Sequence, residues 1–196
     1  PIKSIDEIRE KKIPIKILTS PPGSSPSKAA ERMLSEYGIT PENLKEWGGR
    51  ITYVSYSEAS SLLRDGHADA WCGPIVPAII EMTVSRKMRL LPIKESVLAA
   101  VNEKYKYGRV TVPKGAYYFV PEDTPIMSES MALIVRKDLP EDVVYKITKV
   151  ICEHPDRVRG TGKSHEAFSP ENAWRLVGAP LHPGAERYYR ENGWMK

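Results

Sequence analysis

The spacing of apolar residues along the chain predicts strands that alternate with helices. Short apolar runs bounded by Pro, Gly or Ser are typical of buried strands, whereas the longer segments between them repeat apolar positions at helical spacing. The predicted strands are 14–19, 51–54, 68–72, 88–93 and 131–135. One predicted helix begins after Ser4, and two others end before Gly38 and Gly66. The remaining predicted helices are 77–86, 94–104, 140–152, 169–172 and 183–192. Strands separated by helices of this length predict a mostly parallel sheet with helical faces.

Two local patterns refine this picture. Ser4-x-x-Glu7 and Ser55-x-x-Glu58 have the form of capping boxes, which mark helix starts. Residues 110–125 are rich in Gly, Pro and Tyr and have no helical period, so we expect an irregular crossing or a lid-like loop there.

Composition narrows the classes of protein. The chain has 196 residues, of which 41% are hydrophobic, enough for one large domain or two small lobes. Its net charge is +4, but Lys and Arg are scattered and do not alternate with aromatic residues, so we expect no nucleic-acid partner. No apolar run is long enough to span a bilayer, and any signal or lipid segment is expected to precede Pro1.

The sequence lacks the common catalytic and metal-binding patterns. The four histidines have no ligand-like spacing, and no serine lies in a Gly-x-Ser-x-Gly elbow. Gly160–Ser164 is similar to the end of a phosphate-binding P-loop, but Arg157 stands where that motif needs glycine. We therefore expect no metal, no cofactor and no enzyme. Cys72 and Cys152 are compatible with a disulfide or with two buried free thiols, the commoner outcome.

The loop at 20–26 is the most chemically informative segment. A glycine-containing turn between a strand and a helix presents backbone N–H groups and the positive end of the helix dipole, which suits a carboxylate or phosphate. Ser24 and Ser25 would add hydroxyl donors. The alternative is that one serine is an N-cap with Pro26 in the first turn, and the loop alone slightly favours this alternative.

Aromatic residues stand where they can line a crevice. Trp71 is at a strand end, and Tyr117 and Tyr118 are in the irregular segment. Ligands of open parallel sheets bind at the carboxyl edge of the strands. Each of these residues is equally compatible with core or hinge packing.

Taken in order, the chain resembles the TAXI family, the solute-binding components of tripartite ATP-independent periplasmic (TRAP) transporters. The stretches that carry the likeness cover nearly the whole chain, and Leu181–Ala185 is the most specific. They are Ser4–Ile8, Ile15–Ile17, Pro22–Ser25, Tyr37–Ile39, Ser57–Ala59, Asp65–Ala70, Gly73 with Pro77–Ile79, Leu90–Ile93, Val112–Tyr117, Val144–Lys149 and Pro180–Ala185. Ser25 replaces the usual second glycine of the family's Pro-Gly-Ser-Gly loop.

The resemblance implies an α/β fold of the periplasmic-binding-protein type II class, which closes around its ligand at a hinge. We expect a complete parallel-sheet lobe at 14–125. Residues 1–13 and 126–196 would form the hinge and the C-terminal helices of a partial lobe 1, whose N-terminal part is absent. Apolar surface left on those helices would favour a homodimer.

The resemblance also implies a ligand site. Its expected residues are Ser24 and Ser25 at the anion loop, Tyr117 at the crossover, and Trp71, Gly73 and Pro74 as the crevice wall. His182, Pro183 and Gly184 are interpreted as a helix start.

The expected function is capture of a small carboxylate, an amino acid or a dicarboxylate, outside the cytoplasm or in the periplasm. The expected partners are this anionic solute and the membrane subunits of a TRAP transporter. The alternatives are a sensor domain of a signalling system and, less favoured, an α/β transferase. A transferase would need titratable residues that converge in the crevice, and the sequence shows none.

Overall fold

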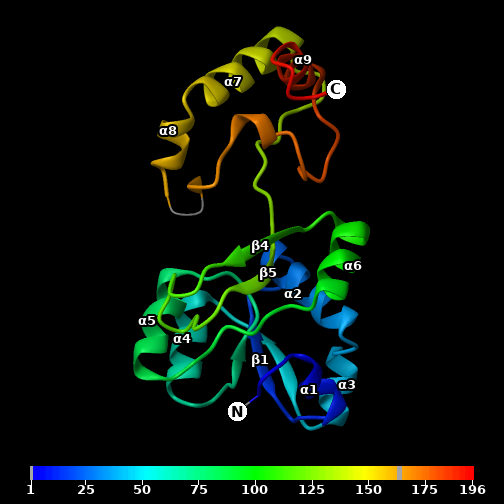
Figure 1. Cartoon of the computed structure of the whole chain (residues 1–196). Helices are drawn as coiled ribbons and strands as arrows, with labels where there is room; N and C mark the ends of the chain where they lie inside the picture. The colour runs from blue at the N-terminus through cyan, green and yellow to red at the C-terminus, as the bar shows by residue number, and fades with distance from the viewer. Residues whose placement is uncertain (1, 163–164) are drawn as a thin grey trace. The chain divides into compact units, whose positions relative to one another are not determined.

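The computed structural model describes residues 2–162 and 165–196, so Lys163 and Ser164 of the P-loop-like segment lie outside the described residues. The chain forms two compact units, one ending at Ser128 and the other beginning at Glu129 (Figure 1). Each unit is described by itself.

A three-stranded parallel sheet is the centre of the first unit. Its strands are β1 (Lys16–Thr19), β2 (Arg50–Tyr53) and β3 (Ala70–Trp71), in the order β2-β1-β3. The chain returns from β1 to β2 through α2 (Ser25–Glu36) and α3 (Pro41–Glu46), and from β2 to β3 through α4 (Tyr56–Arg64). This arrangement confirms the predicted α/β fold and the predicted strands at 14–19, 51–54 and 68–72.

The two faces of the sheet bury different helices (Figure 1). Ile17 belongs to a core with residues of α2 and α6 (Glu95–Tyr105), whereas the next residue, Leu18, belongs to a core with α4 and α5 (Pro77–Ser85). Successive side chains of a strand point to opposite faces, so a strand covered on both faces reads as a continuous apolar run. The short helix α1 (Asp6–Glu10) adds Ile8 to the core that contains Ile17.

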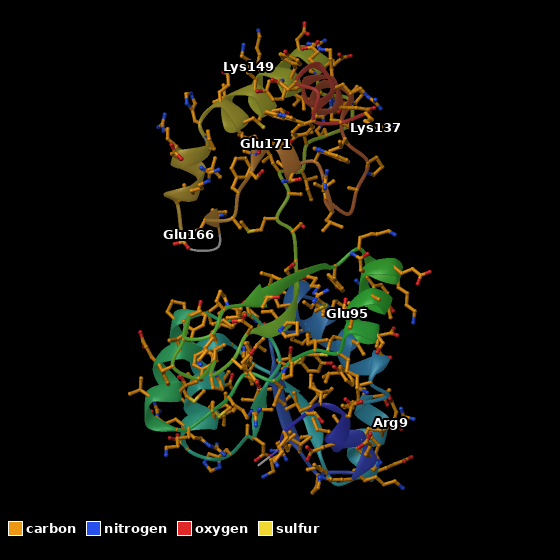
Figure 2. All side chains as sticks on the ribbon, viewed as in Figure 1. Arg9, Glu95, Lys137, Lys149, Glu166 and Glu171 are labelled. Carbon is orange, nitrogen blue, oxygen red and sulfur yellow. The ribbon has the colours of Figure 1, made fainter. Side chains whose placement is uncertain are left out.

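Most helices begin or end where nearby capping residues and glycines predict. Ser55 caps α4 by accepting the Glu58 N–H at 3.3 Å, as its pattern predicts. Gly38 ends the α2 region with φ +71°, and a Cβ there would stand 3.2 Å from Cδ of Arg9, which Figure 2 labels on α1. The predicted Ser4 cap is wrong: α1 begins after Ile5 without a side-chain cap. Glu7 nevertheless accepts the Lys3 N–H at 3.3 Å.

An antiparallel pair completes the first unit. Strands β4 (Gly108–Val112) and β5 (Thr124–Ser128) pair in register, so the prediction of an irregular segment over 110–125 is wrong at both ends. Only the residues between the two strands form the irregular connection that the sequence predicts for the whole of 110–125. This connection is held by the Lys114 N–H, which donates to the Asp123 carboxylate at 2.8 Å, and by the Gly115 N–H, which donates to the Val120 carbonyl at 2.9 Å.

Two other predicted strands are wrong. Residues 88–93 make isolated bonds to the antiparallel pair and its connection: the Leu90 N–H donates to the Phe119 carbonyl and the Ile93 N–H to the Pro125 carbonyl. Residues 131–135 pair with no strand in the described part of the chain. In both places the apolar pattern is present, but a ladder of backbone hydrogen bonds is not.

The second unit is helical. It contains α7 (Glu141–Glu153), α8 (Pro155–Arg159), the 3-10 turn η2 (Pro170–Asn172) and α9 (Pro183–Glu191), which confirms the predicted helices at 140–152 and 183–192. The core of this unit is aromatic, with Tyr145 edge-on to Tyr188 at a centroid distance of 5.4 Å.

Candidate ligand-binding site

The carboxyl ends of the three parallel strands meet at one edge of the sheet. The chain leaving β2 bonds back to the central strand through the Val54 N–H and the Thr19 carbonyl, at 3.0 Å. On the other side the Cys72 N–H donates to the Leu18 carbonyl at 2.8 Å. Open α/β sheets bind ligands at this edge, so we call it the carboxyl edge and define it by Thr19–Ser25, Val54 and Trp71–Pro74.

Ser24 serves as the N-cap of α2. Its hydroxyl donates to the Pro21 carbonyl at 2.7 Å and accepts the Ser27 N–H at 3.3 Å. Ser25 is the first residue of the helix and Pro26 the second, so the structure supports the capping interpretation that the loop alone favoured. The Ser24 hydroxyl is thus already used, and a ligand would have to compete for it.

The first turn of α2 nevertheless keeps its positive character. This helix is 12 residues long and has no Asp or Glu in its first turn to offset the dipole. Gly23, with φ +78°, turns the chain into the helix, and a Cβ there would meet nothing within 4 Å. The turn is therefore open at this point and electrically suited to an anion.

Two hydroxyls of the central strand stand out at the same edge. Thr19 and Ser20 are each only 1% exposed, and their side-chain oxygens have no hydrogen-bond partner in the described part of the chain. A buried hydroxyl left unpaired costs about 1–3 kcal/mol. Sequence reasoning did not include either residue in the site. The available signal was a Thr-Ser pair that ends an apolar strand directly before the anion-type loop.

The predicted crevice wall is a rigid loop. The Trp71 indole N–H donates to the Pro74 carbonyl at 2.9 Å, and Tyr56 packs edge-on against Trp71 at 5.9 Å. A Cβ on Gly73 would stand 2.5 Å from the Trp71 ring, so only glycine fits there. Trp71, Gly73 and Pro74 therefore belong to one short loop, and their role as a crevice wall stays a prediction.

Tyr117 lies in a different cluster. It stacks on Phe119 at a centroid distance of 5.2 Å in the β4–β5 connection, within the cluster that contains Val112 and Val120. Trp71 belongs to another apolar cluster, the one that contains Leu18 and Val54. Ile75, which follows the Trp71–Pro74 wall, packs against the cluster of Tyr117 and links the two regions.

Cys72 at the carboxyl edge and Tyr53, the last residue of β2 beside it, are both held in their neutral forms. Burial raises the pKa of the Cys72 thiol to about 12. The hydrogen bond from the Tyr53 hydroxyl to Glu31, 2.7 Å long, raises the pKa of Tyr53 to about 12 as well. At neutral pH both groups are protonated. The edge thus combines two buried hydroxyls with the N-terminal end of the α2 dipole, groups of the kind that suit an anion without a charged side chain.

In the second unit, His182 caps α9, and its Nδ1 accepts the Gly184 N–H at 3.2 Å. A Cβ on Gly184 would stand 2.2 Å from the Glu141 carbonyl oxygen, so glycine permits α9 to approach α7 closely. These roles agree with the interpretation of 182–184 as a helix start. Cys152 of α7 is a buried free thiol.

No group of three or more potential metal ligands occurs within residues 2–162 and 165–196. None of the helices in that part of the chain has the length and apolar character needed to cross a bilayer.

A comparison with protein families matches residues 1–193 to the NMT1-like family, whose members are periplasmic solute-binding proteins. The match covers almost the whole chain and agrees with the mixed α/β fold. The chain belongs to the NMT1-like family of extracytoplasmic solute-binding proteins.

Proposed function

We propose that this protein captures a small organic carboxylate, an amino acid or a dicarboxylate, and delivers it to the membrane subunits of a TRAP transporter as a TAXI-type receptor. The family supports solute binding, and the resemblance of residues 22–25, 112–117 and 181–185 supports the TAXI assignment. In this proposal residues 14–125 form the ligand lobe, while 1–13 and 126–196 belong to the hinge and to the C-terminal helices of the other lobe.

The observation that carries the proposal is the pair of buried, unpartnered hydroxyls of Thr19 and Ser20. Thr19 ends the central strand and Ser20 follows it, and the loop after them leads into α2, whose first turn contains no Asp or Glu. A carboxylate has up to four acceptor sites and would satisfy both hydroxyls, while the helix dipole favours its charge. Because each hydroxyl is only 1% exposed, the flanking turns must open when the ligand enters.

The proposed site also contains Ser24, Ser25, Trp71, Gly73, Pro74 and Tyr117. Ser24 and Ser25 would present the first turn of α2 to the carboxylate, and the Trp71–Pro74 loop would form one wall. Tyr117 would contribute from the β4–β5 connection after the turns open.

The test is thermal denaturation in the presence of amino acids, dicarboxylates and 2-oxoacids. We expect one class of anion to raise the melting temperature of the native protein, because a ligand that binds only the folded state stabilises it. Thr19→Val and Ser20→Ala should abolish this shift. The same variants should melt at or slightly above the native temperature without ligand, because each removes an unpaired buried hydroxyl.

Thr124→Val is the matched control. Thr124 is also 1% exposed, but its hydroxyl donates to the Glu122 carbonyl at 2.8 Å. This variant should lose roughly 1 kcal/mol of stability and keep the ligand response. If no anion shifts the native protein, or if Thr19→Val responds like the native protein, the carboxylate proposal is wrong.

A further inference from the structure

A concave surface lies beside the outer strand of the sheet. It is a groove of about 340 Å³ between β2, α2 and the start of α3. We call it the β2 groove and define it by Glu31, Ile39, Glu42, Ile51 and Tyr53. Ile51 and Pro41 supply apolar surface above the buried Ile39, and Glu31 and Glu42 supply carboxylates.

The strand that borders the groove has a free hydrogen-bonding edge. The Arg50 N–H donates to the Ile15 carbonyl at 3.1 Å, and the Val54 N–H donates to the Thr19 carbonyl at 3.0 Å. Every second residue of a parallel strand bonds to the same neighbour. Ile51 and Tyr53 therefore direct their N–H and C=O groups away from β1. Within the described residues no further strand pairs with β2.

The same two residues line the groove, so the free edge and the cavity form one surface. An extended chain laid along β2 would bond to the backbone of Ile51 and Tyr53, and every second side chain would face the groove. A small molecule would fill the groove but would leave the backbone edge unused.

The carboxylates that line the groove favour a positively charged partner. Tyr53 donates to Glu31 at 2.7 Å, and this bond is the main reason that the pKa of Glu31 is lowered. Lys28 also pairs with Glu31 at 3.1 Å. Backbone N–H bonding lowers the pKa of Glu42, which has no ion-pair partner among the described residues. Glu31 and Glu42 thus line the groove; Lys28 and Arg32 both act on the charge of Glu31, whereas Glu42 is left for a cation of the partner.

We propose that the β2 groove docks an extended basic segment of a partner protein, which adds to β2 as a fourth strand of the sheet and places a Lys or Arg side chain beside Glu31 and Glu42. Main-chain bonds to Ile51 and Tyr53 provide the orientation, and the carboxylates provide the preference for a basic sequence. This interaction is separate from ligand capture at the carboxyl edge.

The probe is a capped six-residue peptide of alternating Lys and Val, titrated into ¹⁵N-labelled protein. We expect amide shifts at Ile51 and Tyr53, and binding that weakens as salt is added. A peptide of alternating Glu and Val should not bind. A Lys-Val peptide methylated on alternate backbone nitrogens should lose binding, because it cannot complete the ladder.

Variants test the carboxylates. Glu42→Gln should weaken the Lys-Val peptide roughly two- to fivefold, the range expected for one exposed ion pair. Glu46→Gln is the matched control, because Glu46 is exposed on the same helix but does not line the groove. Circular dichroism would verify that both variants fold.

Several results would overturn the proposal. The first two are that the methylated peptide binds as tightly as the parent peptide, or that the basic peptide does not bind at all. The others are that Glu42→Gln and Glu46→Gln have equal effects, or that lysine amide binds as tightly as the peptide. Self-association that occupies β2, detected by sedimentation and by Ile51 shifts that depend on protein concentration, would identify a second copy as the occupant instead.

Discussion

At position 73 the chain has no room for a side chain. A Cβ on Gly73 would stand 2.5 Å from one carbon of the Trp71 ring and 2.8 Å from the next. The ring cannot simply swing away, because its N–H is bonded to the Pro74 carbonyl at 2.9 Å and Tyr56 packs against it. The arrangement of the Trp71 ring in the wall of the candidate site therefore requires glycine at position 73.

Gly73→Ala should destabilise the protein by about 1–3 kcal/mol, the usual cost of an overpacked site. We expect urea unfolding to show this loss. The loss should shrink in a Trp71→Leu background, where the clashing ring atoms are gone, and a double-mutant cycle would measure that coupling. Equal losses in both backgrounds would mean that the ring is not what excludes alanine.

At the scale of single residues, part of the candidate site could be predicted from the sequence. The loop after β3 could be predicted, because a strand end followed by Gly-Pro is a strong local signal, whereas the role of Trp71, Gly73 and Pro74 in ligand binding stays a prediction. The Ser24 cap was also visible in the sequence. Thr19 and Ser20 were not, since the absence of a partner for a buried hydroxyl depends on every neighbour that packs around it.

At the scale of elements, the β4–β5 connection is tied to α5. The Tyr118 hydroxyl donates to the Ile80 carbonyl at 2.9 Å and also bonds the Thr83 hydroxyl. The Tyr118 side chain is otherwise 60% exposed, so these bonds are its main attachment. Tyr117, the preceding residue, stacks on Phe119.

Tyr118→Phe should loosen the connection without unfolding the unit. We expect faster amide hydrogen exchange at residues 114–120, with a loss of about 0.5–1.5 kcal/mol in global stability. Tyr117→Phe is the control, because the Tyr117 ring packs by stacking. It should leave exchange unchanged. If Tyr117 contacts the ligand through its hydroxyl, that variant should weaken ligand binding alone.

Helices were predicted better than strands for a physical reason. Their ends depend on caps and glycines within a few residues, such as Ser55 and Gly38. A strand needs a partner that may lie far along the chain. Residues 88–93 and 131–135 have strand-like composition without a ladder, whereas Gly108–Val112 finds its partner only after the β4–β5 connection.

At the scale of the whole molecule, each compact unit contains one cysteine. Cys72 follows β3 in the first unit, and Cys152 lies in α7 of the second. Burial raises the pKa of the Cys72 thiol to about 12 and that of Cys152 to about 11, from an ordinary value near 9. Alkylation requires the thiolate, so the two thiols report separately on the integrity of the two units.

Native protein should therefore react with iodoacetamide far more slowly than protein in urea at pH 8, at both cysteines. The raised pKa values of the two thiols also determine how the free energy of unfolding changes with pH. Between pH 9 and about 11 the unfolded chain loses its thiol protons while the folded chain keeps them, so the free energy of unfolding falls as pH rises. Tyrosines with raised pKa, such as Tyr53, act in the same direction at higher pH.

Urea unfolding at pH 8 and pH 10 would measure that slope, and Cys72→Ala and Cys152→Ala would isolate the contribution of each thiol. Each replacement should make the slope shallower, because one raised pKa is removed. A slope unchanged by Cys72→Ala would mean that this thiol titrates normally in the folded protein. The β3 end of the carboxyl edge would then be open to water, and an anion bound there would be held less strongly than the buried arrangement implies.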